Sequence, residues 1–254
     1  KGTTEIEGIS SERWTYNENG YPTPKIYNIR EYSAGTNWSG EIAVQFAEGD
    51  GSDKAPYLIS TAEEFVLMLT SGEAGKYYRL IADIAINDTS AADWTATAKK
   101  WFTSNDIPVF EASLDGNGHT VSGIYYDGNQ AGEYAGLIPV VGNTANITNL
   151  TIANSVINAN NGAAGAVAGS IADKCAKVVK FSGVKVEDSV KFEGRAMFGG
   201  IIGKVGYSVL KMSDCISKTN GLFYSATGEA QVSRCVSVGA YPFAETQNIK
   251  AENV

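Results

Sequence analysis

The sequence is poor in the residues that build metal centres and disulfide scaffolds. Among 254 residues it has one histidine, His119, and three cysteines, Cys175, Cys215 and Cys235. A site with two or more imidazole ligands is therefore excluded, and no Cys-x-x-Cys spacing exists to hold zinc. Three cysteines are also too few, and odd in number, for a disulfide framework.

Basic charge is scarce as well. The 28 Asp and Glu residues outnumber the 20 Lys and Arg residues, so the net charge is −8, which argues against a nucleic-acid partner. No apolar run approaches the roughly 18 residues of a membrane span, so we expect no membrane insertion of this segment. The chain opens with Lys-Gly-Thr-Thr, without Met or a leader, and is expected to be a piece of a longer polypeptide.

Glycine is plentiful, and in the second half of the chain it marks a repeat. Segments that begin with Gly and apolar residues recur, and each is followed by a strand-like alternation of apolar and polar residues. The segments are GLIPVVG at 136–142, GAVAGSIA at 165–172, GGIIGKVG at 199–206, GLFYSATG at 221–228 and the degraded AYPFAET at 240–246. Each repeat therefore predicts two short strands, with glycine at a fixed place at the start of the first.

The spacing of these repeats predicts an all-β stack of coils. Aligned second strands place Ile147, Phe181, Met212, Val232 and Ile249 at one position, spaced by 34, 31, 20 and 17 residues. A unit this small cannot bury its own apolar face, so neighbouring units must stack. Asn-Gly turns are too few to punctuate an antiparallel sheet. The pattern therefore indicates a parallel β-helix, with parallel strands from about residue 77 to 254.

Within that stack, the apolar residue at a common offset from each repeated Gly should point inward. These residues are Leu137, Val167, Ile201 and Leu222, and we expect them to form one buried column.

A short helix is expected to cap the open end of the stack, near residues 61–70. Ser60 and Glu63 have the spacing of a capping box, and Phe65, Val66 and Leu69 fall on one helical face. Such a helix would cover strand edges that otherwise invite aggregation. We therefore divide the chain into an N-terminal segment, residues 1–48, and a β-helix module with shrinking repeats, residues 49–254.

Three segments of the module carry a resemblance to a known family. GDGSDKAPYLISTAEEF at 49–65, YYRLIADIAIN at 77–87 and LDGNGHTVSGIYY at 114–126, followed by the Gly-apolar coils, resemble bacterial extracellular proteins with GLUG-type repeats. The resemblance implies a right-handed parallel β-helix of the kind found in adhesin-like surface proteins and beside the catalytic part of IgA-specific metallopeptidases. The chain departs from the motif at Pro139 and Ala166.

By the same resemblance, WTYNENGYPTPK at 14–25 looks like the closing strand of a preceding module. It is equally consistent with a strand that pairs with this module's own coils, and the sequence leaves both alternatives open.

Aromatic residues are the strongest candidates for a ligand site. Several lie in a polar insertion between coils, residues 87–106, and in the coil that follows it. They are Trp94, Trp101, Phe102, Tyr125, Tyr126 and Tyr134. Flat rings on a rigid scaffold suit sugar rings, whereas ordinary loop anchors are the alternative interpretation.

Evidence for a metal site is weaker. Asp50 and Asp53 in GDGSD resemble half of a calcium loop, but the EF-hand spacing and its terminal Glu are absent. Calcium is therefore the one cofactor kept as a hypothesis. His119 follows Asp115 in a Gly-containing turn, where Asp115 and Asn117 are expected to bond their own backbone.

Cys215 and Cys235 occupy the same position in consecutive repeats, so they should stack about 4.8 Å apart. A buried thiol ladder and a disulfide are both consistent with that placement.

Together these features predict a non-catalytic module of an extracellular or cell-surface bacterial protein. Its expected partners are a glycan or a host or cell-surface protein, together with other modules of the same polypeptide. No repeat-aligned pair of carboxylates, and no Lys or Arg beside an Asp cluster, was apparent. A β-helix polysaccharide lyase or glycoside hydrolase, and a purely structural spacer, remain the alternatives.

Overall fold

The structure is a computed structural model that describes residues 14–16, 22–24, 37–71, 73–129, 132–173, 175, 177–239 and 243–254. It divides into two compact units, Lys1–Ser33 and Ala34–Val254. In the first unit, β1 (Trp14–Tyr16) pairs antiparallel with β2 (Pro22–Pro24). These two strands of the 14–25 segment therefore pair with each other. The second unit begins at Ala34, whereas the sequence analysis placed the boundary at residue 49.

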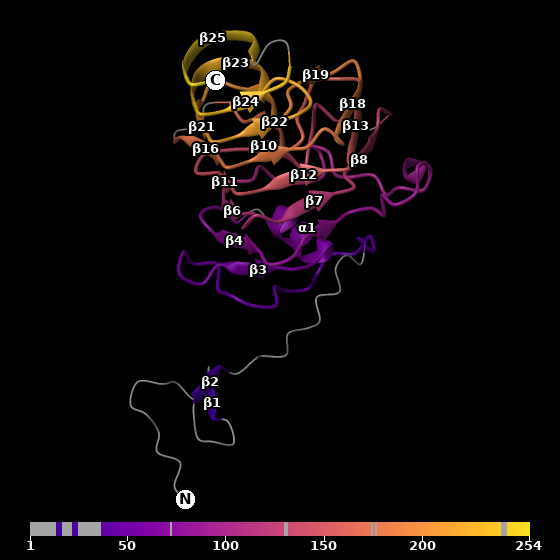
Figure 1. The fold of residues 1–254 in the computed structure, drawn as a ribbon, viewed down its shortest axis with the longest axis vertical. Helices are drawn as coiled ribbons and strands as arrows, with labels where there is room; N and C mark the ends of the chain where they lie inside the picture. Colours follow the sequence, from indigo (N-terminus) through magenta and orange to yellow (C-terminus); the bar gives the residue numbers. More distant parts are fainter. Residues whose placement is uncertain are drawn as a thin grey trace, which may run out of the picture. The chain divides into compact units, whose positions relative to one another are not determined.

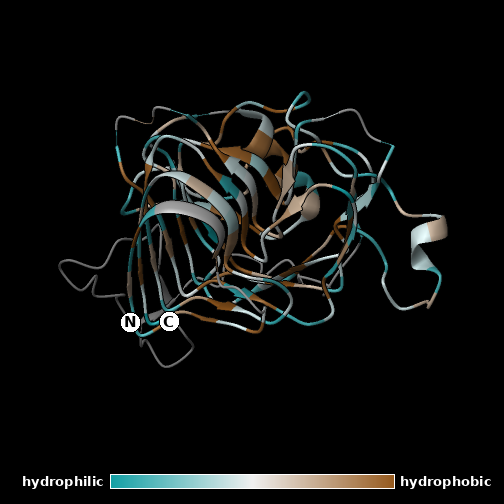
Figure 2. Ribbon diagram, turned by 90° about the horizontal axis from the view of Figure 1, so that it is seen from above, coloured by the Kyte–Doolittle hydropathy of each residue, from teal (hydrophilic) through white to brown (hydrophobic). Residues whose placement is uncertain are grey.

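The second unit consists of parallel strands in four curled sheets (Figures 1 and 2). Every described strand pair in it is parallel, and sheet neighbours belong to successive coils of the chain. Seen from above, the sheets surround a shared interior (Figure 2). The expected parallel, mostly β architecture is confirmed.

The main sheet has the strand order β10-β15-β20-β23-β21-β16-β11-β6-β4-β3, with β25 on the other edge of β23. Its strands are β3 (Tyr57–Ile59), β4 (Tyr77–Leu80), β6 (Ser113–Asp115), β10 (Ile138–Val141), β11 (Asn146–Thr148), β15 (Ala168–Ile171), β16 (Val179–Ser182), β20 (Ile202–Val205), β21 (Val209–Ser213), β23 (Phe223–Ser233) and β25 (Phe243–Glu252). In the two longest strands, β23 and β25, one strand spans the width that two strands share in earlier coils.

Three smaller sheets complete the coils, two of them with only three strands each. The second sheet contains β5 (Ile84–Ala85), β7 (Thr120–Ser122), β12 (Thr151–Ala153), β17 (Lys185–Val186), β22 (Ile216–Ser217) and β24 (Val236–Ser237). The third contains β8 (Tyr125–Asp127), β13 (Val156–Ala159) and β18 (Lys191–Gly194). The fourth contains β9 (Tyr134–Ala135), β14 (Ala163–Ala164) and β19 (Met197–Phe198).

The inward column after each repeated Gly is confirmed. Leu137, Val167, Ile201 and Leu222 are all fully buried. Backbone hydrogen bonds link these neighbours from coil to coil, for example from the Val167 amide to the Ile201 carbonyl at 3.0 Å. A continuous aliphatic column excludes water, and each fully buried side chain of this size contributes roughly 1.5–3 kcal/mol.

Close backbone approach explains the repeated Gly itself. A Cβ atom on Gly165 would lie 2.5 Å from the Ala168 carbonyl oxygen and 2.6 Å from the Gly203 nitrogen. No larger residue fits without moving backbone, so the punctuation seen in the sequence marks a tight corner of the coil.

The second column differs from the sequence alignment in its last member. Ile147, Phe181, Met212 and Val232 are register neighbours, as expected, but Val232 pairs with Ala251. Ile249 pairs instead with Ala230, two residues before Val232, and a bulge between Ala226 and Glu229 changes the offset of the two strands by one residue.

The expected helix is present near the N-terminal end of the stack as α1 (Ala62–Ser71). Its capping box lies one residue later than expected: the Glu64 amide donates to Thr61 Oγ1 at 3.2 Å, and Glu64 Oε2 accepts from the Thr61 amide at 3.3 Å. Glu64 is buried but also accepts from the Ser60 amide and hydroxyl, so its charge is well solvated by donors. Among the described helices none is long and apolar enough to cross a membrane.

We predict that Ile201→Asp unfolds the second unit, because an unpaired charge in the buried column costs several kcal/mol. The matched control is Ile216→Asp, since Ile216 lies in the same repeat but is 37% exposed. Far-UV circular dichroism with thermal melting measures both. A cooperative transition at an unchanged temperature for Ile201→Asp would contradict the inward column.

Candidate functional site

Two of the six candidate aromatics are buried. Trp101 is 2% exposed, and its indole Nε1 donates to the Leu137 carbonyl at 2.8 Å. The ring of Trp38 meets it edge-on with centroids 5.4 Å apart. Tyr126 is equally buried, and its hydroxyl contacts the carbonyl oxygens of Phe102 and Gly136. Neither ring is free to stack on a sugar, which corrects the expected platform.

Phe102 also serves the fold. It is half-buried and packs on Trp38, with ring centroids 5.4 Å apart. Trp101, Phe102 and Trp38 therefore form one anchor that fastens the C-terminal end of the insertion to the coils. This is the loop-anchor alternative, and it holds for these residues because large rings recover the most free energy when buried.

Tyr134 lies in a different sheet from Tyr125, on β9 rather than β8. Its half-buried hydroxyl donates to Glu133 Oε1 at 2.8 Å, and burial together with this carboxylate raises the pKa of Tyr134 to about 12. The hollow beside it measures about 10 Å³, room for no more than one water molecule. Tyr134 is therefore not part of a shared aromatic surface with Trp94.

Trp94 remains accessible, together with Tyr125. Trp94 lies in the short 3-10 helix η1 (Trp94–Ala96), half-buried, and meets the Tyr125 ring nearly edge-on with centroids 6.0 Å apart. Trp94 lines a hollow of about 260 Å³. Its other walls come from later coils and include Asn154, Ser189 and Lys191.

The insertion that carries Trp94 has a fixed base. The Asn87 side chain donates to the carbonyls of Gly123 and Lys99 at 2.7 and 2.9 Å, and its Oδ1 accepts from the Lys99 amide at 2.7 Å. The two ends of the loop are thereby tied to each other and to the next coil. Asn154, Ser189 and Lys191 were missed from the sequence, because they are far along the chain from Trp94 and only the coil register brings them beside it.

The GDGSD loop holds itself together. Asp50 Oδ1 accepts from the Ser52 amide at 2.8 Å, and hydrogen bonds from Ser52 lower the pKa of Asp50. This is an Asx turn. In the part of the chain that the structure describes, no three His, Cys, Asp or Glu side chains are grouped so that they could hold a metal ion. Calcium binding at Asp50 and Asp53 stays an untested prediction.

A second hollow, of about 190 Å³, brings one cation and two carboxylates together. Arg79, Asp115 and Asp53 line it, and Arg79 Nε donates to Asp115 Oδ2 at 3.0 Å. Burial opposes ionisation, but hydrogen bonds from Asn117, Asn149 and Arg79 outweigh it and hold the pKa of Asp115 below its ordinary value. His119 is not part of this hollow; its Nδ1 lies 3.1 Å from Asp83 of the preceding coil.

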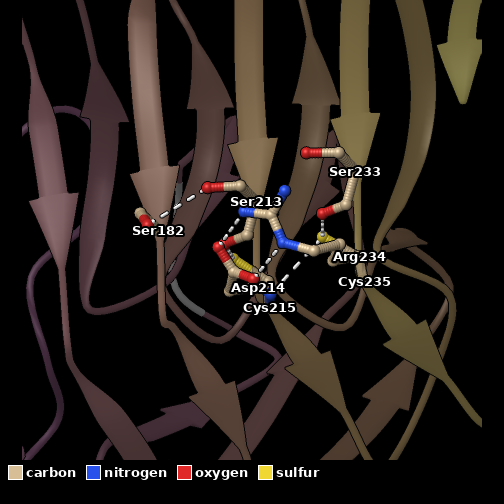
Figure 3. Close-up of polar contacts among 7 residues, drawn as sticks. All are labelled: Ser182, Ser213, Asp214, Cys215, Ser233, Arg234 and Cys235. Carbon is tan, nitrogen blue, oxygen red and sulfur yellow. Dashed lines mark hydrogen bonds and ion pairs between the residues drawn. The ribbon is translucent and has the colours of Figure 1, made fainter. Parts of the chain in front are cut away.

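Cys215 and Cys235 form the thiol ladder (Figure 3). Both are buried and free, and the Cys215 amide lies 3.4 Å from Cys235 Sγ. The neighbouring thiol and burial together raise the pKa of Cys215. Beside them Arg234 pairs through two hydrogen bonds of 2.6 Å with Asp214 of the preceding coil.

The corner just before each of these cysteines needs a left-handed residue. Asn149, Gly183, Asp214 and Arg234 occupy one position in four successive coils and all have φ between 50° and 64°. Asn, Gly and Asp accept this conformation readily. Arg does not, so the bidentate pair with Asp214 helps to hold Arg234 at its corner.

We predict stability losses of different size for substitution of the two tryptophans. Trp101→Ala should lower the free energy of unfolding by about 3–5 kcal/mol, as expected for a large buried ring. Trp94→Ala should lower it by about 1 kcal/mol or less, since that ring is partly solvated. Urea denaturation measures both, and equal losses would contradict the division between anchor and accessible ring.

We also predict that Cys215 and Cys235 resist thiol reagents in the folded protein. Burial makes both thiols inaccessible, and the neighbouring thiol together with burial raises the pKa of Cys215, whereas Cys175 is half-buried. Titration with Ellman's reagent under non-reducing conditions should show at most one fast thiol when folded and three after denaturation. A single thiol in the denatured protein would instead reveal a disulfide.

Comparisons with known proteins give partial likenesses. No family model matches the chain, and no solved structure matches it significantly. Halomucin of Haloquadratum walsbyi is 30% identical over 162 residues, which are 62% of this chain and 2% of that protein. A protein of Evansella cellulosilytica, named as a Gly-rich membrane protein, is 27% identical over 115 residues, 44% of this chain and 12% of that protein. The chain is therefore similar to a small part of two much longer polypeptides.

Proposed function

We propose that the second unit is a right-handed parallel β-helix that serves as a non-catalytic, carbohydrate-binding module of a cell-surface or secreted polypeptide. The parallel, in-register coils and the single α-helix of the described residues support the fold assignment. The likeness to GLUG-type adhesin-like proteins stays a prediction, which the relatives' names do not mention.

The hollow beneath Trp94 is the observation that carries the proposal. It combines an accessible indole with the hydroxyl of Ser189, the amide of Asn154 and the ammonium group of Lys191. An aromatic face with a few fixed polar groups is how protein pockets orient a small polar ligand, and sugar rings present both apolar faces and hydroxyls. Because Asn87 ties the base of the loop, little conformational entropy is lost on binding.

A cell-envelope location follows from the same proposal. One relative is named as a membrane protein, and Halomucin carries the name of a mucin. Both are far longer than the region they share with this chain, which suits one module among many. Other modules of the same polypeptide are then its neighbours.

A polysaccharide lyase or glycoside hydrolase is the second candidate, favoured by the hollow of Arg79, Asp115 and Asp53. Such an enzyme needs a carboxylate or base free to move a proton. Asp115 instead accepts hydrogen bonds from Asn117, Asn149 and Arg79, which hold it ionised. We therefore rank binding above catalysis, and a spacer without ligand third.

We predict that Trp94→Ala weakens glycan binding at least about tenfold while the melting temperature stays nearly unchanged, because the ring stacks on the sugar and contributes little to the core. A glycan array identifies the ligand, and isothermal titration calorimetry measures the affinity. The matched control is Tyr207→Ala, which removes a ring that is 65% exposed elsewhere on the coils.

Three results would count against this assignment. Retained binding with a lower melting temperature would make Trp94 structural. Equal loss in the Tyr207→Ala control would place the site elsewhere. Release of reducing ends, or of unsaturated sugars, by the wild type would favour the enzyme.

A further inference from the structure

The main sheet carries a further hollow, larger than those described above, that runs along the stack on its outer face. It measures about 740 Å³ and spans β11, β16, β21, β23 and β25. Side chains alternate along a strand, so the residue pointing inward leaves its two neighbours pointing outward. Phe181, Met212 and Val232 point into the core, and their backbone forms the floor of a groove between two outward columns.

One wall of this groove is tall and the other is low. The tall wall contains Lys180, Lys211 and Lys250, in the register position just before the floor residues. The low wall contains Ser182, Ser213 and Ser233, just after them, and ends at Glu252 in the last coil. The Ser213 hydroxyl donates to Ser182 Oγ at 3.1 Å, which leaves hydroxyl oxygens of the low wall with acceptor capacity toward the groove.

The charges of the tall wall are only partly balanced by neighbouring carboxylates, since Lys250 and, through space, Lys211 lower the pKa of the same residue, Glu229. Lys180 and Lys211 are direct register neighbours on adjacent strands, and among the described residues neither forms an ion pair or a hydrogen bond through its ammonium group. Lys250 differs, because it pairs with Glu229 at 3.1 Å. Two like charges placed opposite each other on a sheet destabilise it.

Protection of a strand edge does not account for this pair. Lysines often blunt exposed edges, but β16 and β21 are interior strands of the main sheet. Unpaired neighbouring ammonium groups beside a groove are what an anionic ligand requires, in a chain whose net charge of −8 otherwise repels such a ligand.

We propose that this groove binds an extended acidic polysaccharide, a glycan chain that carries carboxylate or sulfate groups. The chain lies parallel to the stack, its anionic groups on Lys180 and Lys211 and its hydroxyls on the serines of the low wall. The five strands cover about 19 Å at about 4.8 Å per step, enough for several sugar units. This site is separate from the hollow beneath Trp94 and does not depend on it.

The lining favours an acidic glycan over a single-stranded nucleic acid. Nucleic-acid grooves add aromatic rings on which bases stack. Among the described residues, the one aromatic that lines this groove is Phe181, which is 1% exposed and faces the core. The polar lining consists of ammonium, hydroxyl and amide groups with one carboxylate, Glu252, at the C-terminal end. The ammonium, hydroxyl and amide groups match the carboxylates, sulfates and hydroxyls of an acidic glycan.

Isothermal titration with polygalacturonate and with heparin tests the proposal on the full chain, with neutral dextran as a control ligand. We expect the wild type to bind at least one acidic polymer and not dextran, with affinity that falls as NaCl is raised. The double variant Lys180→Gln/Lys211→Gln should bind the acidic polymer at least about tenfold more weakly than the wild type. Lys54→Gln/Lys99→Gln is the matched control, since both lysines are exposed, lie outside the groove and lose the same charge.

The remaining arms separate this proposal from its alternatives. Trp94→Ala should retain acidic-polymer binding, so a failure of the Trp94 site and a failure of the groove are distinguishable. No binding of either polymer by the wild type would overturn the groove proposal. So would an equal loss in the two double variants, or equally tight binding of single-stranded DNA, which would show unspecific attraction of polyanions.

Discussion

Parallel, in-register stacking of coils is the constraint on which the rest of this structure depends. It makes each residue a neighbour of its equivalent one coil earlier and one coil later, so any property of one position is repeated along the stack. Inward positions become continuous apolar columns, such as the one through Ile201. Corners become columns of left-handed residues, from Asn149 to Arg234. Outward positions become columns of exposed side chains, and the residue types in neighbouring coils determine whether such a column is neutral, forms ion pairs or carries a net charge.

This repetition explains how much of the fold could be predicted from the sequence. The Gly-apolar punctuation and the alternation after it located the inward columns to the residue, because both follow from backbone geometry that every coil shares. The predictions were wrong by one or two residues at the two ends of the stack, where the backbone geometry differs from that of the other coils. At α1 two adjacent hydroxyls, Ser60 and Thr61, offered competing caps, and burial of Glu64 selected the second. In β25 the degraded last repeat left Ile249 aligned with Val232, two residues from its observed partner, Ala230.

The candidate site was less predictable, because residue type does not tell which way a ring faces. Trp94 and Trp101 lie in the same polar insertion, yet one lines a surface hollow and the other donates to Leu137 inside the core. The insertion interrupts the repeat, and therefore also the alternation of apolar and polar residues from which the direction of each side chain can be predicted. Lys191 joins Trp94 only through coil register. When a site is assembled from an insertion and a later coil, the local sequence can identify the residues of the insertion but not those of the later coil.

The lysines of the tall wall show the opposite case, because the repeat alignment alone was enough to place their side chains on one outward face. Lys180 and Lys211 stand directly before Phe181 and Met212, two residues already assigned to one column. Once those point inward, their predecessors must share the outward face about 4.8 Å apart. A stack held by its inward columns tolerates the resulting repulsion, because the free energy of the core does not depend on which side chains point outward. The inward alternation therefore maintains the fold, while the outward positions are free to form a binding surface whose length grows with each added coil.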